Sequence, residues 1–245
     1  MPGWREALKS NKKGPVVKAR FLSLYGEMML TFAEEILLLT LDDESGRFAY
    51  ADSTELRYAL AGAVLMDLAL RSKIDTDLKR LFVVDSTPTG EEILDRYLGI
   101  ISSANEDYSI RHWVTEIAKN GDDIKDKALN MLVGKGILKV EEKKILWVFE
   151  TRRYPVIDDT EEKEVKRRII DLLLSDEIPT PRDVVLVSLV DACRLFPKIL
   201  SSREAERLAP RIEQIRRLDL IGQAVSQVLE RLRADLANVM LLHHW

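Results

Sequence analysis

The feature that most constrains this chain is an apolar run from Tyr58 to Leu70, in which Asp67 is the one charged residue. Apolar side chains occupy every face of a helix drawn through this run, a pattern typical of a helix buried on all sides. The run spans 13 residues, whereas a helix that crosses a bilayer needs about 20. We therefore predict a helix from Ser53 to Arg71 at the centre of a folded domain.

Polar residues fit both ends of this central helix. Asp52 and Glu55 have the spacing of a capping box, with an aspartate in place of serine or threonine. Asp67 is costly to bury unless it is paired, and Arg71 lies one turn further along the same face. We expect an ion pair between Asp67 and Arg71 near the end of the helix.

The composition is that of a globular chain with a mildly acidic balance. Of 245 residues, 46% are hydrophobic and 32% charged, and the net charge is −4. This balance gives no general attraction to nucleic acid or to an anionic membrane, so such a contact requires a local basic patch. The one cysteine, Cys193, excludes an intrachain disulfide and fits a reducing cytoplasm. We expect a cytoplasmic protein that binds no nucleic acid.

The N-terminus supplies one such patch. Residues 1–20 hold six basic residues against the single acidic residue Glu6, together with glycines and prolines, and they contain no apolar signal segment. We interpret residues 1–27 as a basic arm and residues 28–245 as the folded domain. The arm is either a solvated tail or an electrostatic contact with acidic lipid or a partner.

Periodicity and capping signals predict a mostly α chain with two small β-hairpins. Predicted helices cover 32–41, 91–101, 109–119, 122–133, 160–175, 182–196 and 224–242, and another helix starts after Ser201 and is interrupted at Pro210. The first hairpin pairs KIDTD (73–77) with LKRLFVVD (78–85). The architecture is thus a single multi-helix domain around the buried central helix.

The second predicted hairpin has a charged tip. ILKV (137–140) and ILWVF (145–149) flank Glu141-Glu142-Lys143-Lys144, which is too charged to enter hydrocarbon. Trp147 and Phe149 share one face of the second strand, because side chains alternate along a strand. We expect this apolar face to serve either packing or formation of a homo-oligomer.

Few residues suggest catalysis or metal binding. His243 and His244 are almost terminal, and His112 has no spaced carboxylate or second histidine beside it. Cys193 sits in an apolar run, which is typical of an inert buried thiol. The GKG at 134–136 lacks the remaining residues of a phosphate-binding loop and fits a helix end instead. We expect no enzyme activity, no metal and no cofactor.

Several stretches resemble the Golgi phosphoprotein 3 family of peripheral Golgi adaptors, which bind phosphatidylinositol 4-phosphate. They occur in the family's order and spacing: LTFAEEILLLTLDDESGR (30–47), LAGAVLMDLALRSKI (60–74), DSTPTGEEILD (85–95), the Trp113 helix, LVGKGILK (132–139) and RRYPVIDD (152–159). The resemblance implies a helical domain around a central hydrophobic helix, a projecting hairpin and no catalysis.

The resemblance also implies a lipid-headgroup site. Golgi members place a tryptophan before the central helix, an arginine within it and two arginines at the start of a later helix. Here Ala61, Asp122 and Lys125 occupy the three arginine positions. Tyr50 is the aromatic residue nearest to the tryptophan position, and Arg57 lies one turn before Ala61 on the same face. The expected headgroup residues are therefore Tyr50, Arg57 and Lys125.

Two functions follow from the resemblance. The first is a non-enzymatic peripheral membrane adaptor that binds an anionic phospholipid headgroup, such as phosphatidylinositol 4-phosphate, together with protein partners. It would act on the cytoplasmic face of a membrane, the Golgi in a eukaryote. The alternative is a cytosolic protein–protein scaffold of the same fold that does not bind phosphoinositide.

Overall fold

The structure is a computed structural model that describes residues 30–41, 54–77, 80–145, 149–157 and 159–242. The basic arm and Asp52 lie outside the described residues. The helices are α3 (Phe32–Thr40), α4 (Thr54–Leu70), α5 (Glu92–Ser102), α6 (Ile110–Ala118), α7 (Gly121–Gly134), α8 (Thr160–Leu174), α9 (Pro181–Ala192), α10 (Phe196–Ile199), α11 (Ser202–Arg216) and α12 (Leu220–Leu242). The strands are β1 (Ile74–Thr76), β2 (Leu81–Val83), β3 (Glu141–Ile145) and β4 (Phe149–Arg153).

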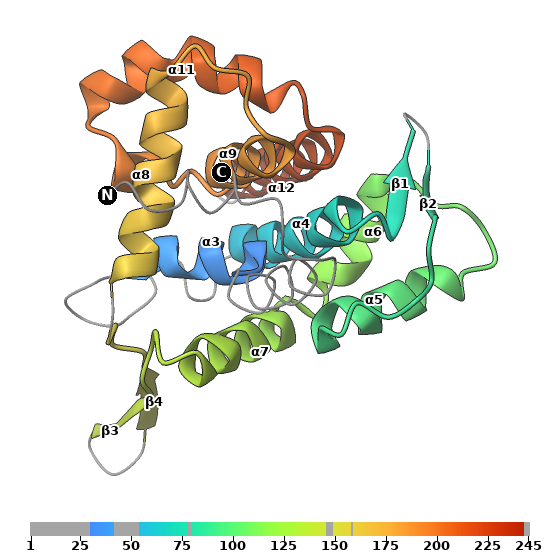
Figure 1. The fold of residues 1–245 in the computed structure, drawn as a ribbon, viewed down its shortest axis with the longest axis horizontal. Helices are drawn as coiled ribbons and strands as arrows, with labels where there is room; N and C mark the ends of the chain where they lie inside the picture. Colours follow the sequence, from blue (N-terminus) through green and yellow to red (C-terminus); the bar gives the residue numbers. More distant parts are fainter. Residues whose placement is uncertain (1–29, 42–53, 78–79, 146–148, 158, 243–245) are drawn as a thin grey trace, which may run out of the picture. The chain divides into compact units, whose positions relative to one another are not determined.

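Helix α4 is the centre of the fold, as the apolar run predicts. It packs against α3, α5, α6, α7, α9 and α12, which surround it in Figure 1. Every residue from Ala59 to Leu68 is buried, and the side chains of Leu65 and Leu68 are completely inaccessible to solvent. Most of the described residues lie in helices, and the short strands form two separate two-stranded antiparallel sheets. The mostly α fold class is therefore confirmed.

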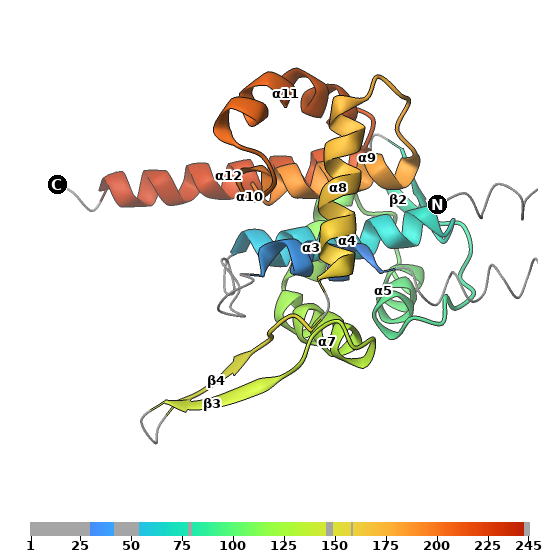
Figure 2. The same cartoon turned by 60° about the vertical axis from the view of Figure 1, so that its left-hand side comes forward.

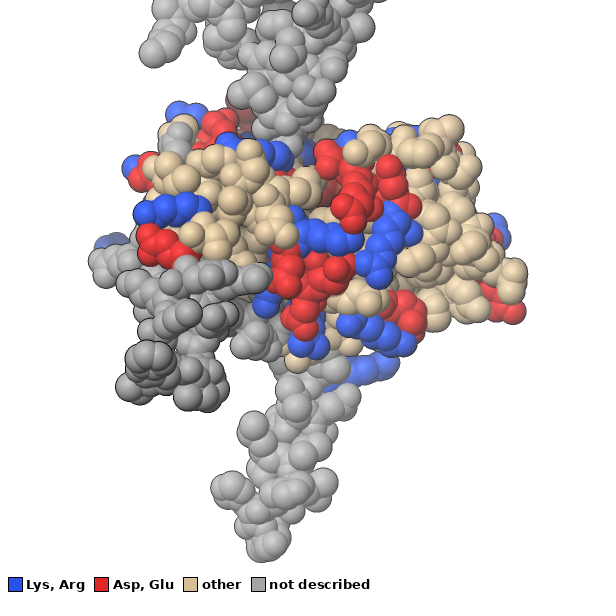
Figure 3. All heavy atoms as spheres, turned by 90° about the horizontal axis from the view of Figure 1, so that it is seen from below, with Lys and Arg blue, Asp and Glu red and all other residues tan. Residues whose placement is uncertain are grey.

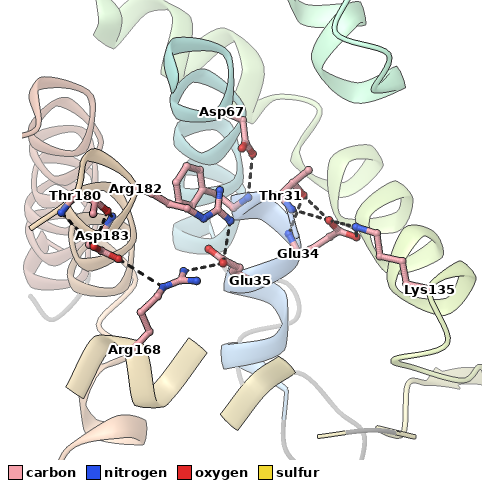
Figure 4. A network of polar contacts seen from close by, with 10 residues as sticks. Thr31, Glu34, Glu35, Asp67, Lys135, Arg168, Thr180, Arg182 and Asp183 are labelled. Atoms are coloured by element: carbon pink, nitrogen blue, oxygen red, sulfur yellow. Dashed lines mark hydrogen bonds and ion pairs between the residues drawn. The ribbon is translucent and has the colours of Figure 1, made fainter. Parts of the chain in front are cut away.

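The expected ion pair between Asp67 and Arg71 is wrong. Among the described residues, the carboxylate of Asp67 accepts a hydrogen bond from the backbone N–H of Phe32 at 2.9 Å, which ties α4 to the start of α3 (Figure 4). Burial raises the pKa of Asp67 to about 7, and the Phe32 N–H and the charges of Arg182 and Arg71 oppose this shift. The Phe32 N–H is an orphan donor of the first helical turn, so Asp67 satisfies a group that needs a partner.

Helix α3 is buried along its whole length, together with two carboxylates. The side chain of Glu34 contacts Lys135 Nζ at 2.7 Å, and Glu35 Oε1 contacts Arg168 and Arg182 at 2.8 and 2.9 Å (Figure 4). These partners come from distant elements, since Lys135 follows α7, Arg168 lies on α8 and Arg182 on α9. Ion pairing offsets the cost of burying Glu34 and Glu35, so the TFAEE stretch joins four parts of the fold.

Capping boxes at Thr31 and Ser201 begin α3 and α11 at the predicted helix starts, and α9 begins with a third capping box at Thr180. The predicted interruption at Pro210 is wrong, because α11 continues through it from Ser202 to Arg216. A proline inside a helix removes one backbone hydrogen bond, and its ring crowds the carbonyl group four residues earlier. The buried side chains of Leu208, Ile212 and Ile215 anchor the helix on both sides of that position.

Two helix boundaries differ from the prediction. Helix α9 ends at Ala192, where Arg194 has the left-handed φ of 54° that terminates many helices. The predicted helix 182–196 is therefore too long, and Pro197 lies in the first turn of the separate helix α10. Helix α12 begins four residues earlier than predicted, because the Asp219 carboxylate accepts the backbone N–H of Ile221 at 3.0 Å and caps the helix.

The register of the second hairpin also differs from the prediction. Residues 141–144 belong to strand β3 rather than to a tip, and they pair with residues 150–153 of β4, beyond the end of the predicted second strand at residue 149. In this register Glu141 pairs with Arg153, and Glu142 pairs with Arg152. Figure 2 shows this hairpin extending from the end of α7. The first hairpin is confirmed, with Ile74 opposite Val83.

Candidate anion-binding site

Helices α4 and α7 approach closely at Gly121, the first residue of α7. A Cβ at this position would lie 2.6 Å from Cβ and 2.8 Å from Cα of Arg57, closer than packed atoms allow. The absence of a side chain at Gly121 therefore lets the start of α7 rest on the backbone of α4. The prediction missed this contact, although a glycine immediately before an acidic helix start was its visible sign.

This approach brings the two predicted cations to one carboxylate. Arg57 Nη2 contacts Asp122 Oδ2 at 2.6 Å, and Lys125 Nζ lies 3.9 Å from Asp122 Oδ1. Arg57 comes from α4 and Lys125 from α7, and Asp122 lies between them at the start of α7. The structure therefore places Arg57 and Lys125 on the same face, grouped around Asp122.

The surrounding surface carries charges of both signs. Arg96 of α5 contacts Asp123 at 2.5 Å, and Lys127 contacts Glu92 at 2.6 Å and Asp123 at 3.7 Å. Figure 3, which views the molecule from below Figure 1, shows blue and red side chains alternating across this face. The cations here face acidic neighbours, so this surface is not a uniformly basic patch.

An anion that binds here must compete with Asp122. The side chains of Arg57 and Asp122 are 43% and 53% exposed, so their pairing is a surface ion pair of about 0 to 1 kcal/mol. Lys125 is more enclosed, with 15% of its side chain exposed. Two cations on different helices suit a phosphate, whereas the carboxylate between them repels one.

The other predicted site residues are not tested by the structure. Tyr50 and Trp147 lie outside the described residues, and Phe149 is described only as the first residue of β4. No helix in the described ranges combines the length and the apolarity needed to cross a membrane.

Comparison with known proteins identifies the family. The family model of Golgi phosphoprotein 3 (GPP34) matches residues 32–232. A protein of Eremothecium gossypii named vacuolar protein sorting-associated protein 74 is 29% identical, over 75% of this chain and 58% of its own length. The protein of that name from Schizosaccharomyces pombe is 30% identical, over 71% of this chain and 54% of its own length. The chain thus spans little more than half of these relatives, and it belongs to the Golgi phosphoprotein 3 family.

Proposed function

We propose that this protein is a non-enzymatic, peripheral membrane adaptor that recognises an anionic phospholipid headgroup through Arg57 and Lys125. Family membership supports an adaptor, and the relatives' name associates them with protein sorting. The phosphatidylinositol 4-phosphate headgroup is the ligand that the resemblance implies. Tyr50, in the segment before α4, would supply the aromatic contact.

The observation that carries this proposal is the convergence of Arg57 and Lys125 from two helices. A phosphate needs several hydrogen-bond donors on one side. Arg57 and Lys125 supply such donors, since both lie within 4 Å of the carboxylate oxygens of Asp122. Because Asp122 already occupies these donors, binding is weak at this site alone. The basic residues of the arm would add about 1 kcal/mol each near an anionic surface.

The carboxylate of Asp122 favours a second function, that of a cytosolic protein–protein scaffold without phosphoinositide binding. Asp122 stands where Golgi members place an arginine, and it neutralises part of the charge that a phosphate requires. Its partners would then bind other faces of the helical domain. The two functions differ in one measurable property, the salt-sensitive attachment to anionic vesicles.

Vesicle flotation tests the proposal. The full chain is mixed with phosphatidylcholine vesicles, with or without phosphatidylinositol 4-phosphate, at low and at physiological salt. We expect flotation that depends on the phosphoinositide and weakens with salt, because screening acts on exposed charges. The double substitution Arg57→Glu, Lys125→Glu should abolish it without lowering the melting temperature.

Deletion of residues 1–27 separates the contribution of the arm from that of the headgroup site. If flotation survives the double substitution and is lost with the arm, the arm alone holds the membrane. No flotation of the unmodified chain at either salt concentration would favour the scaffold.

A further inference from the structure

A second group of basic side chains lies on a different surface of the molecule, between α4, α6 and α12. It lines a groove of about 540 Å³, which is within the size range of small-molecule sites. The groove is lined chiefly by polar and charged residues: Tyr58, Arg111, Thr115, Gln227, Glu230 and Arg231. A neighbouring hollow of about 420 Å³ shares Arg111 and Gln227 and adds Ser109 and Gln223.

The arginines of this groove differ from those around Asp122 in their pairing. In the described part of the chain, neither Arg111 nor Arg231 forms an ion pair with a carboxylate, and Arg111 Nη2 donates a hydrogen bond to Gln227 Oε1. Among the described residues that line the groove, Glu230 is the one acidic residue, and its charge also acts on Arg216. Two arginines against one carboxylate give this described lining a net positive charge.

The spacing of the residues places both arginines toward the same space. Arg111 and Thr115 are four residues apart on α6, and Gln227 and Arg231 are four apart on α12, so each pair shares a helix face. Tyr58 reaches the groove from α4, although its neighbour Arg57 points toward α7. The groove and the Arg57–Lys125 site are therefore built from different residues.

We propose that this groove binds a phosphorylated polyol, held by Arg111 and Arg231 through its phosphate. Arginine matches phosphate because its planar fork makes two parallel hydrogen bonds. The Thr115 hydroxyl donates to the backbone carbonyl of Arg111 at 2.9 Å, so toward the groove it offers an acceptor. Acceptors at Thr115 and Glu230, with polar side chains in the adjoining hollow, suit the hydroxyl groups of a polyol.

Calorimetric titration of the full chain with inositol monophosphate tests the proposal, with unphosphorylated inositol and inorganic phosphate as reference probes. We expect inositol monophosphate to bind more tightly than either reference, since it uses both the arginines and the acceptors. The double substitution Arg111→Gln, Arg231→Gln should weaken its binding by at least about tenfold, because charge-assisted hydrogen bonds are lost. The substitution of lysine at both positions keeps the positive charges but loses the planar guanidinium groups. Its affinity for inositol monophosphate should lie between those of the unmodified chain and the glutamine variant.

The titration is repeated in the Arg57→Glu, Lys125→Glu chain, which lacks the candidate headgroup site and keeps the groove. Binding that depends on Arg111 and Arg231 should persist in this chain. Far-ultraviolet circular dichroism of each variant verifies that the exposed substitutions preserve the fold. The absence of binding by the unmodified chain at millimolar ligand would overturn the proposal, as would the loss of binding in the Arg57→Glu, Lys125→Glu chain.

A competition experiment with vesicles identifies the source of the ligand. Vesicles of phosphatidylcholine with a phosphorylated inositol lipid are offered in competition with soluble inositol monophosphate. Displacement of the soluble ligand supports a lipid headgroup in the groove, and binding of the soluble ligand alone supports a free metabolite. Both results support recognition of a phosphate group in the groove. Binding that is unaffected by the substitution of Arg111 and Arg231, for the soluble ligand and for the vesicles alike, contradicts it.

Discussion

Gly121 of α7 rests on the backbone of Arg57 in α4, and this contact sets the distance between the two helices that carry the candidate headgroup site. A methyl group at Gly121 would meet Cβ, Cγ and Cα of Arg57 at 2.6, 2.7 and 2.8 Å. Because Cα is backbone, rotation of the Arg57 side chain cannot relieve the clash.

Gly121→Ala should therefore destabilise the fold by about 1 to 3 kcal/mol, the usual cost of overpacking. Gly134→Ala is the matched control, since it lies in the same helix and its added Cβ meets no atom within 4 Å. It should be neutral or stabilising by up to about 1 kcal/mol, because alanine favours the helix. Urea unfolding of both variants checks this; equal effects would show that the helices separate without cost.

Leu68→Ala should cost about 2 to 5 kcal/mol as a truncation in the core. The Leu68 side chain has no exposed surface, whereas Leu70, two residues along the same helix, is 39% exposed. Leu70→Ala should cost less than about 1 kcal/mol, because it leaves no closed cavity. A loss below about 0.5 kcal/mol for Leu68→Ala in urea unfolding would contradict the central position of α4.

Asp67 predicts a dependence of stability on pH. Burial raises its pKa from 3.8 to about 7 in the folded chain, opposed by Arg182 and Arg71 and reinforced by the charge of Glu35. Between these values the folded chain retains a proton that the unfolded chain has released. The retained proton contributes at most about 4 kcal/mol to the free energy of unfolding. This contribution is fully present below about pH 4 and is lost as the pH rises to about 7.

Asp67→Asn should make the free energy of unfolding less dependent on pH between about 5 and 7.5, since an amide cannot ionise but can still accept the Phe32 N–H. Asp85→Asn is the control. The pKa of Asp85 is lowered to about 2, chiefly by the Lys73 ammonium and the Thr87 N–H, so Asp85 does not titrate in this range. An unchanged slope in Asp67→Asn would assign the pH dependence to other groups.

The second hairpin remains the predicted place of self-association or of packing, through Trp147 and Phe149. Trp147 lies outside the described residues, which resume at Phe149, the first residue of β4. Trp147→Ser, Phe149→Ser should lower the mass seen in sedimentation if copies of the chain associate there. Glu142→Gln on the same hairpin serves as the control, and an unchanged mass in both variants would leave only a packing role.

The fold could be predicted largely from local signals. The apolar run of α4 identifies the core, and the capping boxes at Thr31 and Ser201 begin α3 and α11 where predicted, because a cap depends on residues only three apart. Non-local interactions explain the errors. The Asp67 contact with Phe32 spans 35 residues, and β3 pairs with residues that lie beyond the predicted second strand.

The candidate site could be predicted only in part, for a similar reason. Sequence comparison places Arg57 and Lys125 near the expected positions, and the structure brings them together. The resemblance puts Asp122 at one of the arginine positions, and its contact with both cations depends on the closeness of α4 and α7 at Gly121. Arg111 and Arg231 pair with no carboxylate in the described part of the chain, and this too depends on helix packing rather than on any local motif.

Flotation of two single variants, Asp122→Asn and Asp123→Asn, tests the proposed headgroup site most directly. Both remove one negative charge from the start of α7, but Asp122 contacts Arg57 and Lys125, whereas Asp123 contacts Arg96 and Lys127. If Arg57 and Lys125 bind the headgroup, Asp122→Asn should increase flotation with phosphatidylinositol 4-phosphate vesicles severalfold and Asp123→Asn much less. An equal increase in both variants, or none in either, would contradict a headgroup site at Arg57 and Lys125.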